Sequence, residues 1–167
     1  TIWLRSESSI TRTQPKIDKL KETYLEAIEK MASGEGPWCA GIAAEENFKK
    51  EELIAKVNRA YESIQLELDL KKAVGDADLV IESMAENTND KIVFYKALAP
   101  LLPEKTVLVT NSSTLLPSAF AKYTGRPEKY LSLHFANSIW KNNTAEVMAQ
   151  SKTDKKYFDE IMQFAND

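Results

Sequence analysis

The sequence predicts an α/β fold, a Rossmann-like, mostly parallel sheet with helices on both faces. Two observations favour this class. Short apolar runs suited to buried strands alternate with longer segments of helical periodicity. Polar side chains also follow two of the strand runs directly, and ligands of open α/β sheets bind at the carboxyl ends of the strands. The sequence therefore predicts a fold class and the sheet edge that would carry a site.

The first predicted elements are a strand and a long helix. Residues 1–5 form an apolar run that reads as the second strand of such a sheet. Pro15 suits the first turn of a helix, where no N–H is needed. Gly34 is a typical residue just beyond a helix end. Apolar residues at helical spacing lie between them: Ile17, Leu20, Tyr24, Ile28 and Met31.

This helix belongs to a helical excursion over about residues 13–60. A loop with Trp38 and Cys39 leads to a charged helix near residues 46–60. The apolar side of that helix carries Phe48, Leu53, Ile54 and Val57. Residues 63–68 then read as the third strand of the sheet.

The next strand run ends in a polar cluster. Residues 79–81 are a continuous apolar run, which is typical of a strand buried on both faces of a parallel sheet. Glu82, Glu86 and Asn87 follow it.

A helix and another buried strand come after this cluster. The helical pattern stops at Pro103 and rests on five apolar residues: Ile92, Phe94, Tyr95, Leu98 and Leu102. Residues 106–110 read as the strand, and the polar turn 111–114 ends it. Two successive strands thus place polar groups where α/β sheets bind ligands.

The only histidine, His134, stands at the end of a third apolar run, and Glu146 lies twelve positions later in a further run. An imidazole at a strand end can carry a proton near neutral pH, and a carboxylate on the next strand can orient it. The alternative is a histidine with a structural or surface role, which the spacing alone does not exclude.

Four ordered blocks in residues 69–165 resemble the cofactor domain of the L-3-hydroxyacyl-CoA dehydrogenases. DADLVIESMAEN resembles the family's VIEA run ending in EN, and TNSST resembles its SNTSS turn. HFAN resembles HFxNP, and the segment around Glu146 resembles its VEV strand. No block is decisive alone, but the ordered set is specific.

The resemblance implies roles for individual residues. His134 matches the family's general base, Glu146 the carboxylate that holds the imidazole, and Ser113 the serine that hydrogen-bonds the substrate oxygen. Glu86, Lys91 and Asn137 match positions that contact the cofactor. The residues alone leave plainer alternatives open: a solvated Glu86–Lys91 pair at a helix start, and a turn or capping hydroxyl at Ser113. No metal site is expected.

The chain also departs from the family pattern. Ser138 replaces the proline of HFxNP, and the stretch IWKNNTA before Glu146 is bulkier and more polar than the family's apolar one. Because proline fixes φ, we expect a looser turn after Asn137 and an altered substrate shape near the reacting carbon.

The family's phosphate-binding turn has no counterpart here. None of the five glycines, at positions 34, 36, 41, 75 and 125, forms a GxGxxG pattern. We expect residues 1–167 to be a partial NAD(P)-binding domain that lacks the first βα unit and the C-terminal helical domain of the family. By themselves these residues are expected to show little or no catalysis and to expose sheet edges.

Arg5 bears on the choice of cofactor. It stands where NAD-dependent members of the family carry an acidic residue at the end of the second strand. Arg5 followed by Ser6 would bind a ribose 2′-phosphate through charge-assisted hydrogen bonds, which favours NADP over NAD. A surface arginine at a strand end is the alternative.

The amino-acid composition limits the classes of partner expected for this protein. The net charge of −3 gives no electrostatic case for nucleic acid, and no apolar stretch is long enough to span a membrane. The single cysteine forbids an internal disulfide and fits a reducing compartment, so the cytoplasm is the expected location. The resemblance implies an acyl-CoA substrate and a homodimer for the full-length protein.

Three functions stay open at this point. The leading one is NAD(P)-dependent interconversion of a 3-hydroxyacyl-CoA and its 3-oxo form. The second is a dehydrogenase of a free hydroxy acid such as carnitine or a sugar acid. The third is a non-catalytic, crystallin-like structural protein, against which the joint presence of His134, Glu146 and Ser113 argues.

Overall fold

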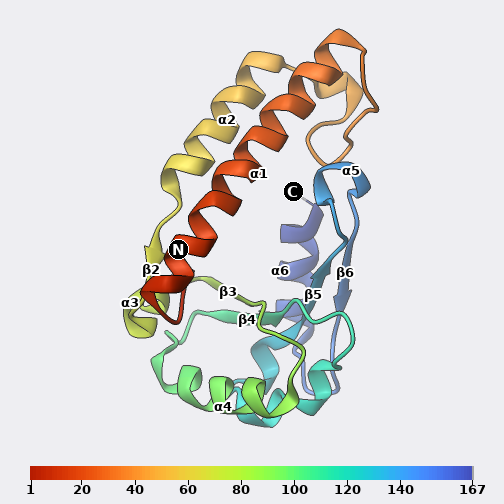
Figure 1. Ribbon diagram of the computed structural model, residues 1–167. Coiled ribbons are helices and arrows are strands. Elements are labelled where there is room, and N and C mark those ends of the chain that lie inside the picture. The colour runs from red at the N-terminus through yellow and green to blue at the C-terminus, as the bar shows by residue number, and fades with distance from the viewer. Residues whose placement is uncertain (167) are drawn as a thin grey trace. The chain divides into compact units, whose positions relative to one another are not determined.

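The computed structural model describes residues 1–166 and divides into two compact units. The first unit comprises Thr1–Leu68 and Ala136–Thr144, and the second comprises Asp69–Phe135 and residues from Ala145 onward. Figure 1 shows the course of the chain through both. Mostly parallel strand pairs together with helices give the predicted Rossmann-like α/β fold.

The first unit is a helical hairpin joined to a small parallel sheet. In this sheet β1 (Ile2–Trp3) pairs with β2 (Leu66–Glu67). The helices α1 (Glu7–Ser33) and α2 (Lys50–Ser63) run side by side (Figure 1), and η1 (Glu45–Asn47) lies in the loop between them. A short helix from far along the chain, α5 (Ile139–Asn142), completes the unit.

Helix α1 starts earlier than the sequence predicted. Ser6 is its extended N-cap residue, and Pro15 lies inside the helix rather than in its first turn. A proline in a helix removes one backbone hydrogen bond, and this 27-residue helix tolerates that loss. The predicted end is confirmed, because Gly34 adopts the left-handed conformation (φ 72°) and donates its N–H to the Lys30 carbonyl.

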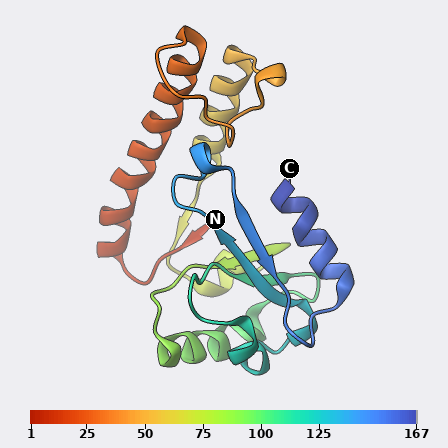
Figure 2. The ribbon, with the colours of Figure 1, turned by 90° about the vertical axis from the view of Figure 1, so that its right-hand side faces the viewer.

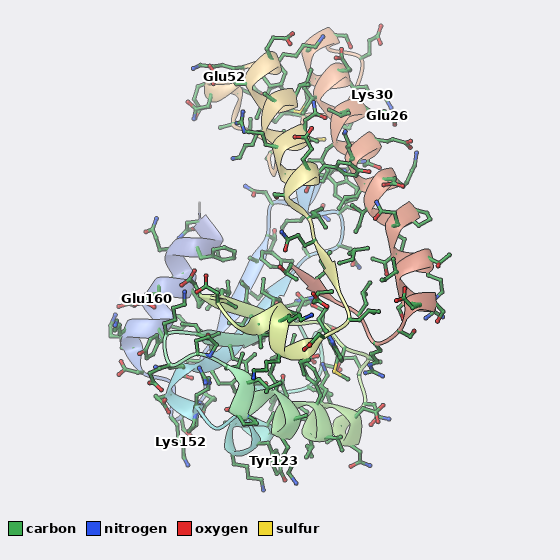
Figure 3. The ribbon with its side chains drawn as sticks, turned by 90° about the vertical axis from the view of Figure 1, so that its left-hand side faces the viewer. Glu26, Lys30, Glu52, Tyr123, Lys152 and Glu160 are labelled. Atoms are coloured by element: carbon green, nitrogen blue, oxygen red, sulfur yellow. The ribbon has the colours of Figure 1, made fainter. Side chains whose placement is uncertain are left out.

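The predicted charged helix and third strand are both shifted. Helix α2 occupies Lys50–Ser63, a few residues beyond the range expected, so Ser63 is helical and the third strand shrinks to β2. The hairpin carries its charges on the outside. Glu26 and Lys30 of α1 and Glu52 of α2 project into solvent (Figure 3).

A close backbone approach ties the loop between α1 and α2 to α5. The Gly41 N–H donates to the Trp140 carbonyl at 3.1 Å. A Cβ atom at Gly41 would lie 2.1 Å from the Ile139 carbonyl oxygen, so only glycine fits. The Trp140 ring also packs against Tyr24 of α1, with centroids 5.8 Å apart.

The second unit is built on a four-stranded sheet in the order β3-β4-β5-β6. The strands are β3 (Leu79–Glu82), β4 (Val107–Thr110), β5 (Tyr130–Phe135) and β6 (Ala145–Met148). The pairs β3–β4 and β4–β5 are parallel, whereas β5–β6 is antiparallel. The helices are α3 (Leu70–Val74), α4 (Thr88–Leu98) and α6 (Lys155–Asn166), and the 3₁₀ turns are η2 (Ala99–Leu101), η3 (Pro117–Ala119), η4 (Ala121–Tyr123) and η5 (Pro127–Lys129).

Alternate residues of the central strands enter two cores. Leu108 and Tyr130 pack with Tyr95 and Leu98 of α4 on one face. On the other face, Ile161 of α6 packs with the residues that alternate with these along the strands: Val107, Val109, Leu131 and Leu133. Figure 2 shows α6 beside the β5–β6 pair. The expectation of helices on both faces is therefore confirmed.

Strand β3 is less buried than its sequence predicted. It stands first in the strand order of the described sheet, and Ile81 remains 40% exposed. The prediction of a strand buried on both faces is wrong for β3 and correct for β4, whose four residues are all buried. Among residues 1–166, the structure contains no helix long and apolar enough to cross a membrane.

Candidate active site

His134 and Glu146 form a pair across two adjacent strands. His134 near the end of β5 lies opposite Glu146 of β6 in the antiparallel register. The His134 Nδ1 atom is 3.2 Å from the Glu146 Oε2 atom. The histidine side chain is 26% exposed, so the ring is partly sheltered from solvent.

The geometry of the pair allows a distinct role for each ring nitrogen. An ionised carboxylate can only accept hydrogen bonds, so the tautomer with its proton on Nδ1 is the one that can donate to Glu146. Nε2 of the neutral ring is then left with its lone pair and can take up a proton.

Ser113 lies in the turn after β4, and Glu86 holds that turn. The Glu86 carboxylate accepts the Ser112 hydroxyl at 2.7 Å, the Ser113 backbone N–H at 3.2 Å and the Thr114 hydroxyl at 3.3 Å. Glu86 follows β3, so this cluster links the carboxyl ends of two neighbouring parallel strands. The predicted site residues Glu86 and Ser113 are thus brought together, and both are exposed.

The pKa of the Glu86 carboxyl lies below its usual range. Partial desolvation acts to raise it, but the hydrogen bonds from the 112–114 turn and the charge of Lys91 outweigh this effect. Glu86 is therefore a carboxylate near neutral pH.

Asn111 connects the β4 turn to the strand that carries the histidine. Its backbone N–H donates to the Glu82 carbonyl at 2.8 Å. Its side-chain oxygen accepts the Phe135 backbone N–H at 3.0 Å, one residue beyond His134. The ends of β3, β4 and β5 are therefore joined through one asparagine.

Lys91 does not form the solvated pair with Glu86 that the sequence left open. Its side chain is fully buried, and its Nζ donates to Glu82 Oε1 at 2.7 Å. Nζ also donates to the Met84 carbonyl at 3.3 Å. The predicted contact between Lys91 and the cofactor stays a prediction, and the ammonium group is bound to Glu82.

The remaining predicted site residues belong to the first unit. Arg5 and Ser6 are exposed between β1 and α1, where the Ser6 hydroxyl bonds to those of Ser8 and Ser9 at 2.9 and 3.1 Å. Asn137 is exposed, and its carbonyl accepts the side-chain amide of Asn142.

Ser138, which replaces the family's proline, adopts a left-handed conformation. Its φ is 56°, far from the value near −65° that a proline ring imposes. Replacing the motif's proline by Ser138 therefore goes with a backbone conformation at this position that proline cannot adopt.

The sequence reasoning missed the surroundings of Glu82. This carboxylate is buried and accepts Tyr95, Thr110 and the Met84 N–H in addition to Lys91. One signal was available: Lys91 and Tyr95 are four residues apart on one helix, and both can face an acid that ends an apolar strand.

Most of the chain is similar to known proteins. A family model described as the NAD binding domain of 3-hydroxyacyl-CoA dehydrogenase matches residues 17–167. The chain is 31% identical over 157 residues to a 3-hydroxybutyryl-CoA dehydrogenase of Clostridioides difficile, covering 93% of this chain and 50% of that protein. It is 25% identical over 156 residues to the human mitochondrial hydroxyacyl-coenzyme A dehydrogenase, covering 93% and 46%. The chain spans about half the length of these curated relatives.

Solved structures share the fold. A diketoreductase, described as performing dual catalysis of dicarbonyl compounds, matches with a TM-score of 0.80 and 36% identity, over 98% of this chain and 50% of that one. A 3-hydroxybutyryl-CoA dehydrogenase from Escherichia coli K12 matches with a TM-score of 0.74 and 23% identity, over 98% and 30%.

Proposed function

The chain belongs to the 3-hydroxyacyl-CoA dehydrogenase family through its NAD-binding domain, and from this premise we propose that it serves NAD(P)-dependent interconversion of 3-hydroxyacyl-CoA and 3-oxoacyl-CoA. One observation carries the proposal. His134 stands near the end of β5, the strand after β3 and β4 in the sheet, and its Nδ1 atom lies 3.2 Å from the Glu146 Oε2 atom. A histidine paired with a carboxylate is an arrangement suited to acid–base catalysis.

His134 is the proposed acid–base catalyst. Its Nε2 takes the proton of the substrate hydroxyl during oxidation and returns it during reduction. Glu146 fixes the ring through Nδ1 and stabilises the imidazolium once it has formed. Ser113, exposed on the neighbouring turn, is proposed to donate its hydroxyl hydrogen to the substrate oxygen.

The carboxyl ends of β3 and β4 are the proposed dinucleotide site. Glu86 offers carboxylate acceptors suited to hydroxyl groups, and it stands at the sheet edge where such ligands bind. Asn137 is proposed as a further contact. A bound NAD(P) would accept the hydride that leaves the hydroxyl-bearing carbon.

NADP is the proposed preference, because Arg5 is exposed and can pair with a 2′-phosphate. The ratio of the Kd values for NADPH and NADH checks this. Arg5→Asp should reverse the preference, and equal affinities for the two cofactors in the wild type would refute it.

A free dicarbonyl compound is the second candidate substrate. The 36% identity to a diketoreductase over 98% of this chain favours it. The polar stretch of residues 139–145 agrees, because it departs from the family's apolar one. A free hydroxy acid is also a candidate substrate, because its hydroxyl group would undergo the same hydride transfer. A structural protein would not need the His134–Glu146 pair.

A location and an assembly state are also proposed. The composition favours the cytoplasm, and the resemblance favours a homodimer of the full-length protein, with no membrane or nucleic acid as a partner.

The test is a substrate panel with the full-length protein. NADH or NADPH oxidation is followed with acetoacetyl-CoA, a free diketone and a free 3-oxo acid. The leading proposal expects the highest kcat/KM for the CoA ester, the second candidate expects it for the diketone, and no oxidation with any of the three overturns both.

A further inference from the structure

Five polar side chains are buried together in the second unit. Glu82, Lys91, Tyr95, Thr110 and Tyr130 are each at most 3% exposed. The Glu82 carboxylate is the centre: Oε1 accepts the Lys91 ammonium at 2.7 Å, and Oε2 accepts the hydroxyls of Tyr95 at 2.7 Å and Thr110 at 2.9 Å. The Tyr95 and Tyr130 hydroxyls lie 2.9 Å apart. We refer to these five side chains as the Glu82 network.

Stability alone is a weak reason for such a network. Two charges lose their hydration when they are buried, and apolar residues of similar volume often serve the fold equally well. Burial and the nearby Tyr130 and Glu82 raise the pKa of Tyr95, so its hydroxyl stays protonated and keeps donating. The Tyr95 hydroxyl is therefore held as a hydrogen-bond donor to Glu82.

One arm of the Glu82 network fixes the turn that leads to Glu86. Glu82 Oε1 accepts the Met84 backbone N–H at 2.6 Å, and Lys91 Nζ donates to the Met84 carbonyl at 3.3 Å. Both backbone groups of Met84 are thus bound to the ion pair. Glu86, two residues later, is the carboxylate that holds the Ser113 turn.

The other arm fixes the Ser113 turn itself. Thr110, which donates to Glu82, accepts the Ser112 backbone N–H at 3.2 Å. Ser112 in turn donates its hydroxyl to Glu86 at 2.7 Å. The two arms meet at Glu86, which one arm reaches along the backbone from Met84 and the other through the hydrogen bond from Ser112.

We propose that Glu82 and Lys91 are positioning residues, whose buried ion pair sets the turns that place Glu86 and Ser113. This inference rests on the function proposed above. It assigns Lys91 a different role from the direct cofactor contact that the resemblance implies, because its ammonium is fully buried and bound to Glu82 and Met84.

Turnover and cofactor affinity together separate a positioning role from a direct contact. In the full-length protein, Lys91→Met should lower kcat by about tenfold or more through misplacement of the turns. The Kd for NADH and NADPH, from quenching of intrinsic fluorescence, should rise as well, because the misplaced turn carries Glu86, the proposed cofactor contact. Lys96→Met, an exposed lysine on the same helix, is the matched control and should change neither. A Kd that rises with kcat unchanged would overturn the proposal.

A second set of variants separates positioning from folding. Glu82→Leu, Lys91→Met and Tyr95→Phe together give an apolar centre, and the Thr110 and Tyr130 hydroxyls remain. This triple variant should fold with a Tm below that of wild type, because the Thr110 and Tyr130 hydroxyls and the Met84 backbone groups lose partners, and it should show kcat reduced about tenfold. Wild-type kcat in the folded variant would mean a merely structural role. Tyr95→Phe alone removes one hydroxyl, and it should lower kcat in the same direction by a smaller factor.

Amide exchange tests the network independently of turnover. In Tyr95→Phe and Lys91→Met, the N–H groups of Met84, Ser112 and Ser113 should exchange faster than in wild type, and amides in β5 should not. Unchanged exchange at these three amides would refute the proposal. If the wild-type protein turns over no substrate of the panel, the proposed function fails, and this exchange measurement still decides the role of the ion pair.

Discussion

His134 and Glu146 are direct partners in the antiparallel register of β5 and β6, and their side chains meet at 3.2 Å. In a strand, side chains alternate between the two faces of the sheet. A slip of one residue would therefore move Glu146 to the opposite face and leave the imidazole without its carboxylate. The acid–base pair depends on this register.

Restoring the family's proline at position 138 should damage the fold. Ser138 has φ 56°, which a proline ring cannot adopt. We expect Ser138→Pro to lower the free energy of unfolding by more than about 1 kcal/mol, whereas Ser138→Gly should cost less than about 1 kcal/mol because glycine accepts this conformation. Urea denaturation measures both. A proline variant as stable as wild type would mean that the turn has a different backbone course.

Gly41 should not tolerate a side chain. Its Cβ would lie 2.1 Å from the Ile139 carbonyl oxygen, so Gly41→Ala must push the loop away from α5 at a cost of about 1–3 kcal/mol. Gly36→Ala is the control, because its Cβ would meet only the Lys30 side chain, at 3.0 Å. Amide exchange over residues 136–144 should rise in Gly41→Ala alone; equal exchange in the two variants contradicts the account.

Glu86 should make stability depend on pH in the acid range. Its pKa is depressed in the folded protein, so its contribution is present above the unfolded pKa and is lost as pH falls through the folded one. Glu86→Gln should cost up to about 1 kcal/mol at pH 7, since the exposed site is screened. The difference between the two proteins should vanish in acid. A difference that is constant with pH would show that the charge is not involved.

The open edge of β3 should promote association of the 167-residue chain. Ile81 is 40% exposed on a strand that pairs only with β4 among the described strands. A lysine on an edge strand discourages pairing with another copy, so Ile81→Lys should reduce self-association in sedimentation velocity. Val93→Lys, on helix α4 and 69% exposed, should leave association unchanged. Equal association of both variants and wild type would exclude β3 as the contact.

Local patterns predicted the elements of the second unit well. The apolar runs at 79–81 and 106–110 became β3 and β4, and the run before His134 became β5. Each run is bounded by turn residues, so the local signal and the packed structure agree. The position of a strand in its sheet depends on tertiary packing, however. The apolar runs of β3 and β4 are similar, so the sequence could not predict that Ile81 of β3 is exposed.

The part of the candidate site that the sequence predicted is the part whose residue types have a well-defined chemistry. The His134–Glu146 pair followed from two strand ends twelve residues apart and a family motif. The partner of Lys91 was not predictable from spacing, because Glu86 and Glu82 are both near it along the chain and only the packing of α4 on β3 selects Glu82. The prediction that Pro15 lies in the first turn of its helix was wrong for a similar reason. The packing of a long helix outweighs the loss of one backbone hydrogen bond.

The most direct test of the account is turnover of acetoacetyl-CoA with NADH or NADPH by the full-length protein and its His134→Gln variant. Glutamine cannot accept the proton, so kcat should fall by about 10²–10⁴-fold while the Kd of the cofactor changes little. Glu146→Gln should lower kcat by a smaller factor, because the ring keeps its proton acceptor but loses its carboxylate. A kcat for His134→Gln equal to that of wild type would contradict the proposed mechanism.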